Sequence, residues 1–271
     1  MRVMAVLLAV CCALAPAVTA TAVPGPRLPT GFVVDPGERA TKFQIDLSLW
    51  VLASASRQSG VYGAYGQRSY WDIDNDEQPF RVENNFRPEF GLVWGEDAGK
   101  SLVDAWPDGL AASVAFVHES NGLEQELSRG WNRIVGGLHF GADQALLRGA
   151  ILGWYAFRVE DTNKDITRDA GDGEVRLVVD LTELMDGSSL WVRSAFSPDA
   201  RSGYFFTNLD TELHIWPRFL PGWLFPGQDG PPVDLVVEWF VGTGEFLYDY
   251  AAYTNRVRVG ITLRGGLGQA P

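Results

Sequence analysis

Apolar and polar side chains alternate along most of this chain, in segments of roughly ten residues. In residues 233–243 the apolar positions are odd-numbered and end with Trp239 and Val241, whereas Asp234 and Glu238 are even-numbered. Successive side chains of a strand point to opposite faces, so this period of two predicts strands with one apolar and one polar face. The segments with this pattern are 43–53, 61–71, 85–95, 110–120, 130–141, 147–158, 173–182, 189–197, 203–215, 233–243 and 254–264.

Two all-β architectures fit these segments, a soluble sandwich and a transmembrane barrel. In a sandwich the apolar faces form the core, whereas in a barrel they face lipid and the polar faces line the interior. The segment length matches the 9–11 residues that a tilted strand needs to cross a bilayer, and Trp and Tyr near the segment ends suit an interfacial belt. Bacterial barrels usually have an even number of strands. We therefore expect an antiparallel transmembrane β-barrel of 12 strands, with the missing strand around 30–34.

The N-terminal segment has the pattern of an export signal. An apolar run follows one early arginine and ends in small residues, so we expect a signal peptide over 1–20, cleaved after Ala20 or Ala22. A short membrane anchor is the alternative, but the apolar run is too short to span a bilayer. We expect an N-terminal segment over 21–40 and the barrel domain over 41–271.

Charge and cysteine content narrow the function classes. The chain has 22 Lys and Arg against 34 Asp and Glu, for a net charge of −12. Nucleic-acid affinity depends largely on basic residues that contact phosphates, so this balance argues against a nucleic-acid partner. Both cysteines, Cys11 and Cys12, lie in the expected signal peptide. The exported chain is therefore expected to contain no disulfide.

Three polar residues of interest lie on the apolar faces of two consecutive segments. His118 and Ser120 share their parity with Phe116, and Asn132 shares its parity with Ile134. In an antiparallel hairpin, directly opposite residues have a constant sum of residue numbers. Placing His118 opposite Asn132 gives an even sum, which keeps all the even-numbered side chains on one face. The three polar groups are then neighbours on the outer wall of a barrel.

A serine, an imidazole and an amide in this order could form a nucleophile, a general base and a group that orients the base. We therefore take Ser120, His118 and Asn132 as candidate catalytic residues. The alternative is an ordinary polar cluster without chemistry, since a His-x-Ser pair alone is common. His139 and His214 lie on the polar faces of their segments, so we interpret both as interior or solvated residues.

Two motifs of this hairpin are recognisable together. The first half reads His-x-Ser-Asn-Gly from His118, and the second reads Ser-Arg-x-Trp-Asn-Arg from Ser128. This pair of motifs resembles bacterial outer membrane phospholipase A, and the resemblance covers about residues 40 to 264. Further segments that look like this family, in the same order, are Phe43–Leu49, Tyr65–Trp71, Pro79–Asn84, Asp165–Thr167 and Gly244–Tyr250.

The resemblance implies a 12-stranded barrel in the bacterial outer membrane that hydrolyses acyl esters of membrane phospholipids, at either glycerol position and in lysophospholipids. It implies calcium as cofactor, a homodimer as the active form and a monomer as the latent form. Ser120 would be the nucleophile, His118 the base and Asn132 the orienting residue. The backbone N–H of Gly122 would donate into the oxyanion hole. The alternative is a catalytically silent barrel that acts as a channel or scaffold.

The resemblance also implies a calcium site and a dimer contact. Gln67 matches a glutamine at the dimer contact of the family. Thr162 replaces an aspartate at a second calcium site, where Asp161 or Glu160 could serve instead. Leu123 stands where the family has arginine, but the backbone carbonyl can bind the ion. The implied ligand positions are Leu123, Ser128, Glu77 from the partner subunit and Thr162.

Overall fold

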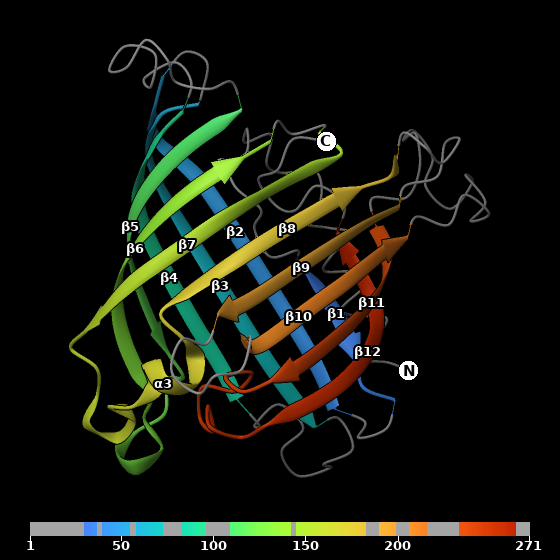
Figure 1. Ribbon diagram of the computed structural model, residues 1–271. Coiled ribbons are helices and arrows are strands. Elements are labelled where there is room, and N and C mark those ends of the chain that lie inside the picture. Colours follow the sequence, from blue (N-terminus) through green and yellow to red (C-terminus); the bar gives the residue numbers. More distant parts are fainter. Residues whose placement is uncertain are drawn as a thin grey trace.

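The chain folds into a closed antiparallel barrel, in which consecutive strands pair and β1 joins β12 (Figure 1). The computed structural model describes residues 30–36, 40–54, 58–72, 83–95, 109–141, 145–182, 190–198, 206–215 and 233–263. The expected signal peptide over 1–20 and the candidate ligand Glu77 lie outside these residues. The strands are β1 (Gly31–Val34), β2 (Ala40–Ala53), β3 (Gly60–Asp72), β4 (Glu83–Trp94), β5 (Leu110–Ser120), β6 (Gly130–Phe140), β7 (Leu147–Phe157), β8 (Gly173–Asp180), β9 (Leu190–Pro198), β10 (Phe206–Ile215), β11 (Val233–Gly242) and β12 (Thr254–Leu263).

The predicted 12-stranded barrel is confirmed. Each of the eleven segments with alternating side chains forms a strand, and β1 is the strand that we expected around residues 30–34. It pairs with β2 on one side and β12 on the other, and so closes the barrel. The barrel therefore begins at Gly31, inside the range 21–40 that we expected to precede it.

The alternating side chains divide between an outer apolar wall and an inner polar wall. On β11, Trp239 is 44% exposed, whereas its neighbour Glu238 is 1% exposed. On β5, Phe116 is 42% exposed and its inward neighbour Val117 is 4% exposed, so the inner wall also holds an apolar cluster. Because the sheet closes on itself with its apolar side chains outward, the soluble sandwich is excluded. Among the described residues, no helix is long and apolar enough to cross a bilayer.

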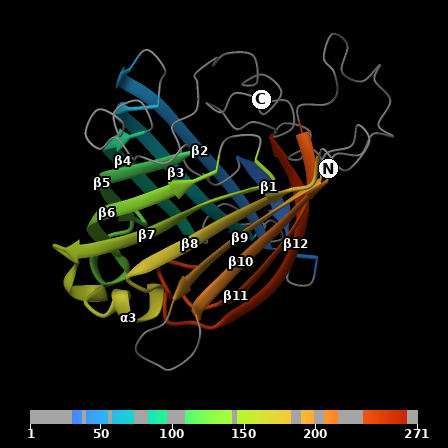
Figure 2. The ribbon, with the colours of Figure 1, turned by 45° about the horizontal axis from the view of Figure 1, so that its top comes forward.

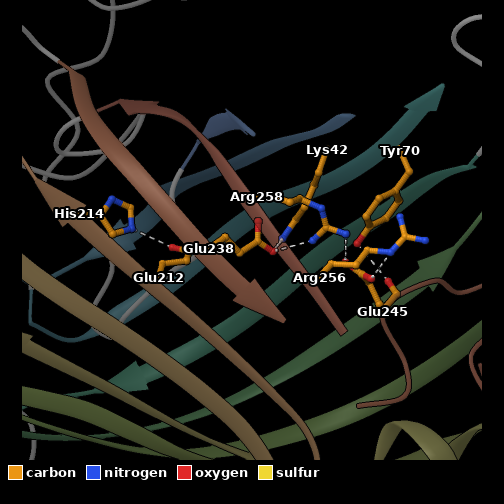
Figure 3. A network of polar contacts seen from close by, with 8 residues as sticks. All are labelled: Lys42, Tyr70, Glu212, His214, Glu238, Glu245, Arg256 and Arg258. Atoms are coloured by element: carbon orange, nitrogen blue, oxygen red, sulfur yellow. Dashed lines mark hydrogen bonds and ion pairs between the residues drawn. The ribbon is translucent and has the colours of Figure 1, made fainter. Parts of the chain in front are cut away.

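Buried ion pairs connect the strands across the inside of the barrel (Figure 3). The Glu238 carboxylate accepts from Lys42 Nζ at 2.6 Å and from Arg258 Nη1 at 3.1 Å, and the same guanidinium also pairs with Glu245. His214 is fully buried beside a neighbouring carboxylate, so its predicted interior position is confirmed. Buried charges are tolerated when they are paired, so these groups can fill the lumen at little net cost.

Short helices and turns gather at one end of the barrel, which we call the loop end. It carries η1 (Gln125–Leu127), η2 (Asp161–Asn163), α3 (Ile166–Ala170) and the β11–β12 turn (Figures 1 and 2). Ile166 is fully buried against Trp131 of β6 and Leu247 of the β11–β12 turn. This packing attaches the loop end to the strand that carries Asn132.

Candidate active site

The β5–β6 hairpin brings together the three candidate catalytic residues. His118 lies directly opposite Asn132, and Ser120 lies opposite Gly130, so the predicted pairing of the strands is confirmed. His118 Nδ1 and Asn132 Oδ1 are 3.0 Å apart. Phe116 and Ile134, which share their face, are 42% exposed each. The three polar groups therefore lie on the outer wall.

Two hydrogen bonds fix the amide of Asn132 and, through it, the tautomer of His118. Asn132 Nδ2 donates to the carbonyl of Arg158 at 3.2 Å, so the amide oxygen faces the imidazole. That oxygen can only accept, and His118 Nδ1 must therefore carry the proton. The other ring nitrogen, Nε2, is left with a free lone pair, which is the state that a general base requires.

Arg158 reaches this position in an uncommon backbone conformation. It follows β7 directly and has a φ of 45°, and it is the only non-glycine residue with positive φ in the described part of the chain. Left-handed backbone costs an L-residue roughly 1–2 kcal/mol. Such conformations are often found at functional sites. The carbonyl of Arg158 is thus a polar group of the site that sequence reasoning missed.

Ser120 and His118 are side by side on one face, and both are partly buried. Within the described residues, their side chains do not form a hydrogen bond with each other. Catalytic hydrogen bonds are commonly long without substrate and shorten in the complex. The geometry therefore provides the order serine, imidazole, amide, with the imidazole–amide contact already formed.

The surroundings of the three residues are aromatic. Ser120 lies opposite Phe86 of β4, and Asn132 lies opposite Phe157 of β7. The rings of Phe116 and Phe157 pack at 6.1 Å between centroids. An ester with long acyl chains could lie against this wall without losing contact with apolar surface.

A second Ser–His pair lies on the same two strands but faces the lumen. Ser113 Oγ and His139 Nε2 are 2.8 Å apart, and both line a cavity inside the barrel. The predicted interior position of His139 is confirmed, and Ser113 is the partner that we did not foresee. Because this pair is enclosed by the inner wall, it offers a matched control for Ser120 and His118.

The loop after Ser120 is organised by Asn121, which is 2% exposed. Its side-chain oxygen accepts from the backbone N–H groups of Leu123 and Arg129, and its amide donates to the carbonyl of Leu127. Gly122 has a φ of +65°, and a Cβ there would lie 3.0 Å from Phe86. The loop therefore needs glycine at the position proposed for the oxyanion hole, and Asn121 is a second residue whose role sequence reasoning missed.

Three of the candidate calcium ligands, Leu123, Ser128 and Thr162, lie at or near this loop, and Glu77 lies outside the described residues. Thr162 Oγ1 donates to the carbonyl of Ser128 at 2.6 Å, so these two positions are in contact. Leu123 is 40% exposed on the same loop. The Glu160 carboxylate lies close to Gly130, because a Cβ added at Gly130 would be only 2.6 Å from Glu160 Oε1. Hydroxyl, carbonyl and carboxylate oxygens are the donor types that calcium prefers, so the chemistry of these residues suits the ion.

The guanidinium of Arg129 already contacts one of the candidate calcium ligands, the carbonyl of Ser128. Arg129 Nη1 donates to the carbonyls of Glu126 and Ser128 at 2.7 and 2.8 Å. An ion bound through the Ser128 carbonyl would therefore compete with this guanidinium. Among the described residues, no group of three His, Cys, Asp or Glu side chains is arranged to hold a metal. A site here would depend on carbonyl and hydroxyl oxygens.

Gln67 lies on the outer wall in the same cross-strand row as Ser120. It pairs across the sheet with Phe86, which pairs in turn with Ser120. Its amide oxygen accepts from Tyr65 Oη at 2.8 Å, and its amide nitrogen donates to Ser69 Oγ at 2.9 Å. Gln67, Phe86 and Ser120 therefore form one row across three strands of the outer wall.

Outside the strands, one side-chain pair connects α3 to the β11–β12 turn. Tyr250 donates a hydrogen bond to Asp165, which precedes α3. Burial and this bond raise the pKa of the Tyr250 hydroxyl to about 12, and the same bond lowers the pKa of Asp165. The pair therefore helps to hold the loop end together near neutral pH.

A closed barrel with an apolar outer wall, and with a serine, a histidine and an asparagine on that wall, defines an outer-membrane β-barrel with the features of a serine hydrolase. The family model for phospholipase A1 matches residues 30–263. The chain therefore belongs to the phospholipase A1 family, and it is a phospholipase of the bacterial outer membrane.

Curated relatives and solved structures agree with this assignment. The chain is 28% identical over 231 residues to phospholipase A1 of Escherichia coli K12, covering 82% of this chain and 68% of the relative. It is 27% identical to phospholipase A1 of Klebsiella pneumoniae, covering 82% and 69%.

Two solved structures share the fold. One is an active-site asparagine-to-alanine mutant of Escherichia coli outer membrane phospholipase A, with a TM-score of 0.65, 21% identity and 93% and 95% of the two chains covered. The other is the Salmonella typhi outer membrane phospholipase dimer with bound calcium, with a TM-score of 0.65, 22% identity and coverage of 86% and 89%.

Proposed function

We propose that this protein is a calcium-dependent phospholipase that uses Ser120, His118 and Asn132 to hydrolyse acyl esters of glycerophospholipids and lysophospholipids. The observation that carries the proposal is the His118–Asn132 hydrogen bond beside Ser120 on the lipid-facing wall. It leaves His118 Nε2 free to accept a proton. The active-site asparagine named for the Escherichia coli relative supports a role for Asn132.

The reaction would proceed through an acyl-enzyme. His118 Nε2 takes the proton of the Ser120 hydroxyl while Oγ attacks the ester carbonyl carbon. The backbone N–H of Gly122 donates to the oxygen that becomes negative. His118 then gives its proton to the departing glycerol oxygen, and the carbon–oxygen bond of the ester breaks. A water molecule, deprotonated by His118, then attacks the acyl carbon. The bond between this carbon and Ser120 Oγ breaks, His118 returns its proton to Oγ, and the fatty acid is released.

The neutral amide of Asn132 suits a site on the outer wall. Asn132 accepts the Nδ1 proton of His118 and so holds the ring in position during both proton transfers. A carboxylate could accept the same proton, but an unpaired charge facing lipid is costly. The amide is already satisfied on its other side by the Arg158 carbonyl.

We propose a calcium ion at the loop beside Ser120, held by the Leu123 carbonyl, Ser128 and Glu77 of the partner subunit, and a second calcium site at Thr162. When bound, calcium would add positive charge near the developing oxyanion. We further propose that the monomer is latent and that dimerisation, with Gln67 at the contact, completes the site. The bound calcium named for the Salmonella typhi dimer supports this arrangement.

Fatty-acid release from phospholipid in detergent micelles with calcium tests the proposed reaction. We expect release by the parent protein, loss of release in Ser120→Ala, and near-parent release in Ser113→Ala, which removes the lumenal Ser–His pair. Equal release by Ser120→Ala and the parent would exclude Ser120 as nucleophile. A folded parent without release would favour the silent barrel instead.

Sedimentation in density-matched detergent tests the proposed dimer. We expect calcium to increase the dimer fraction together with the rate of fatty-acid release, and Gln67→Leu to decrease both. Glu77→Ala should weaken calcium activation without changing the monomeric barrel. A protein that is fully active as a monomer would contradict the proposed activation.

A further inference from the structure

We propose that the carboxylate of Glu160 binds the ammonium group of a phospholipid head group beside Ser120. This protein would then prefer phospholipids with an ammonium head group, such as phosphatidylethanolamine, over those with an uncharged alcohol there, such as phosphatidylglycerol. The preference rests on the proposed function, because it names the substrate class of the same site, whereas the contact itself can be measured without hydrolysis. Glu160 lies in the β7–β8 loop, at the loop end of the barrel.

The side chain of Glu160 covers the outer wall directly beside Ser120. Gly130 lies opposite Ser120 at an outward position of β6, yet it is buried. The three atoms nearest to a Cβ added at Gly130 all belong to the Glu160 side chain, with Oε1 at 2.6 Å, Cδ at 3.1 Å and Cγ at 3.6 Å. The Glu160 N–H also donates to the Gly130 carbonyl at 3.0 Å. Backbone and side chain of Glu160 are therefore both held at this point of the wall.

This arrangement places the carboxylate within reach of a lipid bound at Ser120. The Cβ positions of directly opposite residues lie about 4.5–5.5 Å apart on one face of a sheet. Glu160 Oε1 therefore lies no more than about 8 Å from Ser120 Cβ. Ser120 ends β5 and Gly130 begins β6, so the carboxylate lies at the rim of the apolar wall. A phospholipid with its ester at Ser120 and its acyl chain along the wall would place its head group at this rim.

The Glu160 carboxylate is not used by another group of the chain. In the described part of the chain, it has no hydrogen-bond or ion-pair partner, although the residue is partly buried. The next carboxylate, Asp161, differs in both respects, because its side chain is 90% exposed and forms an ion pair with Lys164 at 2.8 Å. An unpaired charge that is partly removed from water costs free energy. A cation that arrives with the substrate would offset this cost.

A head-group ammonium suits a single carboxylate of this kind. A primary ammonium carries three N–H donors, and one carboxylate is enough to form a charge-assisted hydrogen bond with it. Calcium takes roughly 6–8 oxygen ligands, and the carbonyl of Ser128 already accepts from Thr162 and Arg129. Phosphatidylglycerol offers no cation, and the carboxylate repels its negative phosphate. Glu160 therefore favours lipids whose head group carries an ammonium.

Hydrolysis of two lipids with the same acyl chains tests the preference, in neutral detergent micelles at saturating calcium. We expect kcat/KM of the parent to be at least fivefold higher for phosphatidylethanolamine than for phosphatidylglycerol. The ratio should fall below twofold in Glu160→Gln, through KM rather than kcat, because the head group is not a reacting group. Asp161→Asn removes the same charge from the adjacent residue and should keep the parent ratio. Glu160→Lys should reverse the preference.

Three results would overturn the proposal. One is equal hydrolysis of the two lipids by the parent. Another is the same change of ratio in Asp161→Asn as in Glu160→Gln, since that would be a long-range effect of charge. The third is a Glu160→Gln variant that needs more calcium with both lipids at the parent ratio, since this would make Glu160 a calcium ligand.

Carbodiimide coupling tests the contact without hydrolysis, because the reagent joins a carboxylate directly to a primary amine that touches it. The sample is Ser120→Ala in micelles of a diether phosphatidylethanolamine, which has no ester to cleave. We expect mass spectrometry to find lipid on Glu160 at least fivefold more often than on Asp161, and no such excess with soluble ethanolamine. Lipid on Glu160 no more often than on Asp161 would overturn the proposal, whether or not the Glu160 variants fold.

The two proposals can fail separately. A folded parent that hydrolyses neither lipid refutes the proposed function, and the coupling in Ser120→Ala still decides whether Glu160 binds the head group. Hydrolysis that depends on Ser120 without coupling at Glu160 keeps the proposed function and removes the head-group contact.

Discussion

Replacing Asn132 by alanine tests whether the amide acts by orienting His118. The change removes the acceptor 3.0 Å from His118 Nδ1 and the donor 3.2 Å from the Arg158 carbonyl. His118 could then rotate or place its proton on the other ring nitrogen. Neither the amide oxygen nor the amide nitrogen takes part in the bond-breaking step. The substitution leaves Ser120 in place, and we expect the barrel to stay folded.

The expected loss follows from the strength of one neutral hydrogen bond. Such a bond contributes about 1 kcal/mol net and roughly up to 2 kcal/mol when a polar partner is left unsatisfied. Since about 1.4 kcal/mol corresponds to a tenfold change in rate, kcat should fall about 5- to 30-fold. The amide does not contact the ester in this arrangement, so KM should change little.

The assay is fatty-acid release from micelles at saturating calcium, with kcat and KM measured separately. Asn132→Asp is the informative partner, because its carboxylate can still accept from His118 Nδ1 but loses the donor to the Arg158 carbonyl, so it should recover only part of the rate. The heat-dependent gel mobility of a folded barrel controls for unfolding. A decrease in kcat of less than twofold in Asn132→Ala would refute the orienting role.

Three further changes test the loops around the site. Arg158→Gly relieves the positive φ of 45° and should raise the unfolding free energy by about 1 kcal/mol at unchanged activity, measured by urea titration in detergent. A loss of activity would show that the arginine side chain takes part. Gly122→Val should lower kcat about tenfold or more, because a branched side chain at φ +65° would press on Phe86 and displace the N–H proposed for the oxyanion. Normal kcat in that variant would remove Gly122 from the site. The Tyr250–Asp165 pair should protect residues 161–172 from hydrogen exchange near neutral pH. This protection should disappear as the pH rises above 10 toward 12, where Tyr250 loses its proton, because the folded state raises the pKa of Tyr250. It should also disappear as the pH falls below 3.8, where Asp165 gains a proton, because the folded state lowers the pKa of Asp165. Tyr250→Phe should remove this protection at neutral pH, and equal protection in both proteins would contradict the assignment.

Much of the barrel could be predicted because a single period of two runs through every strand. The outward residues are apolar for lipid and the inward ones polar for the lumen, so each strand and its facing direction were readable. The same parity argument gave the correct pairing of His118 with Asn132. Even the short β1 was foreseen, since an even number of strands required one more.

The contacts that refine the site could not be read in this way. The Arg158 carbonyl depends on a positive φ at a residue that gives no sign of it in the sequence. Asn121 organises its loop through three backbone partners that follow no periodic spacing. Glu119 and Arg133 form an ion pair on the inner wall behind the site. The sequence shows these two residues only as inward polar positions, because the choice of partner depends on the twist and register of the sheet.

The outward position of Ser120 and His118 has a consequence for inhibitors. A competitive inhibitor must first dissolve in the bilayer before it can meet the serine, so its potency would be set by its mole fraction in the membrane. Two compounds with equal intrinsic affinity would then differ in apparent potency by the ratio of their partition coefficients. Adding inert lipid vesicles should weaken both by dilution in the membrane phase, at constant aqueous volume.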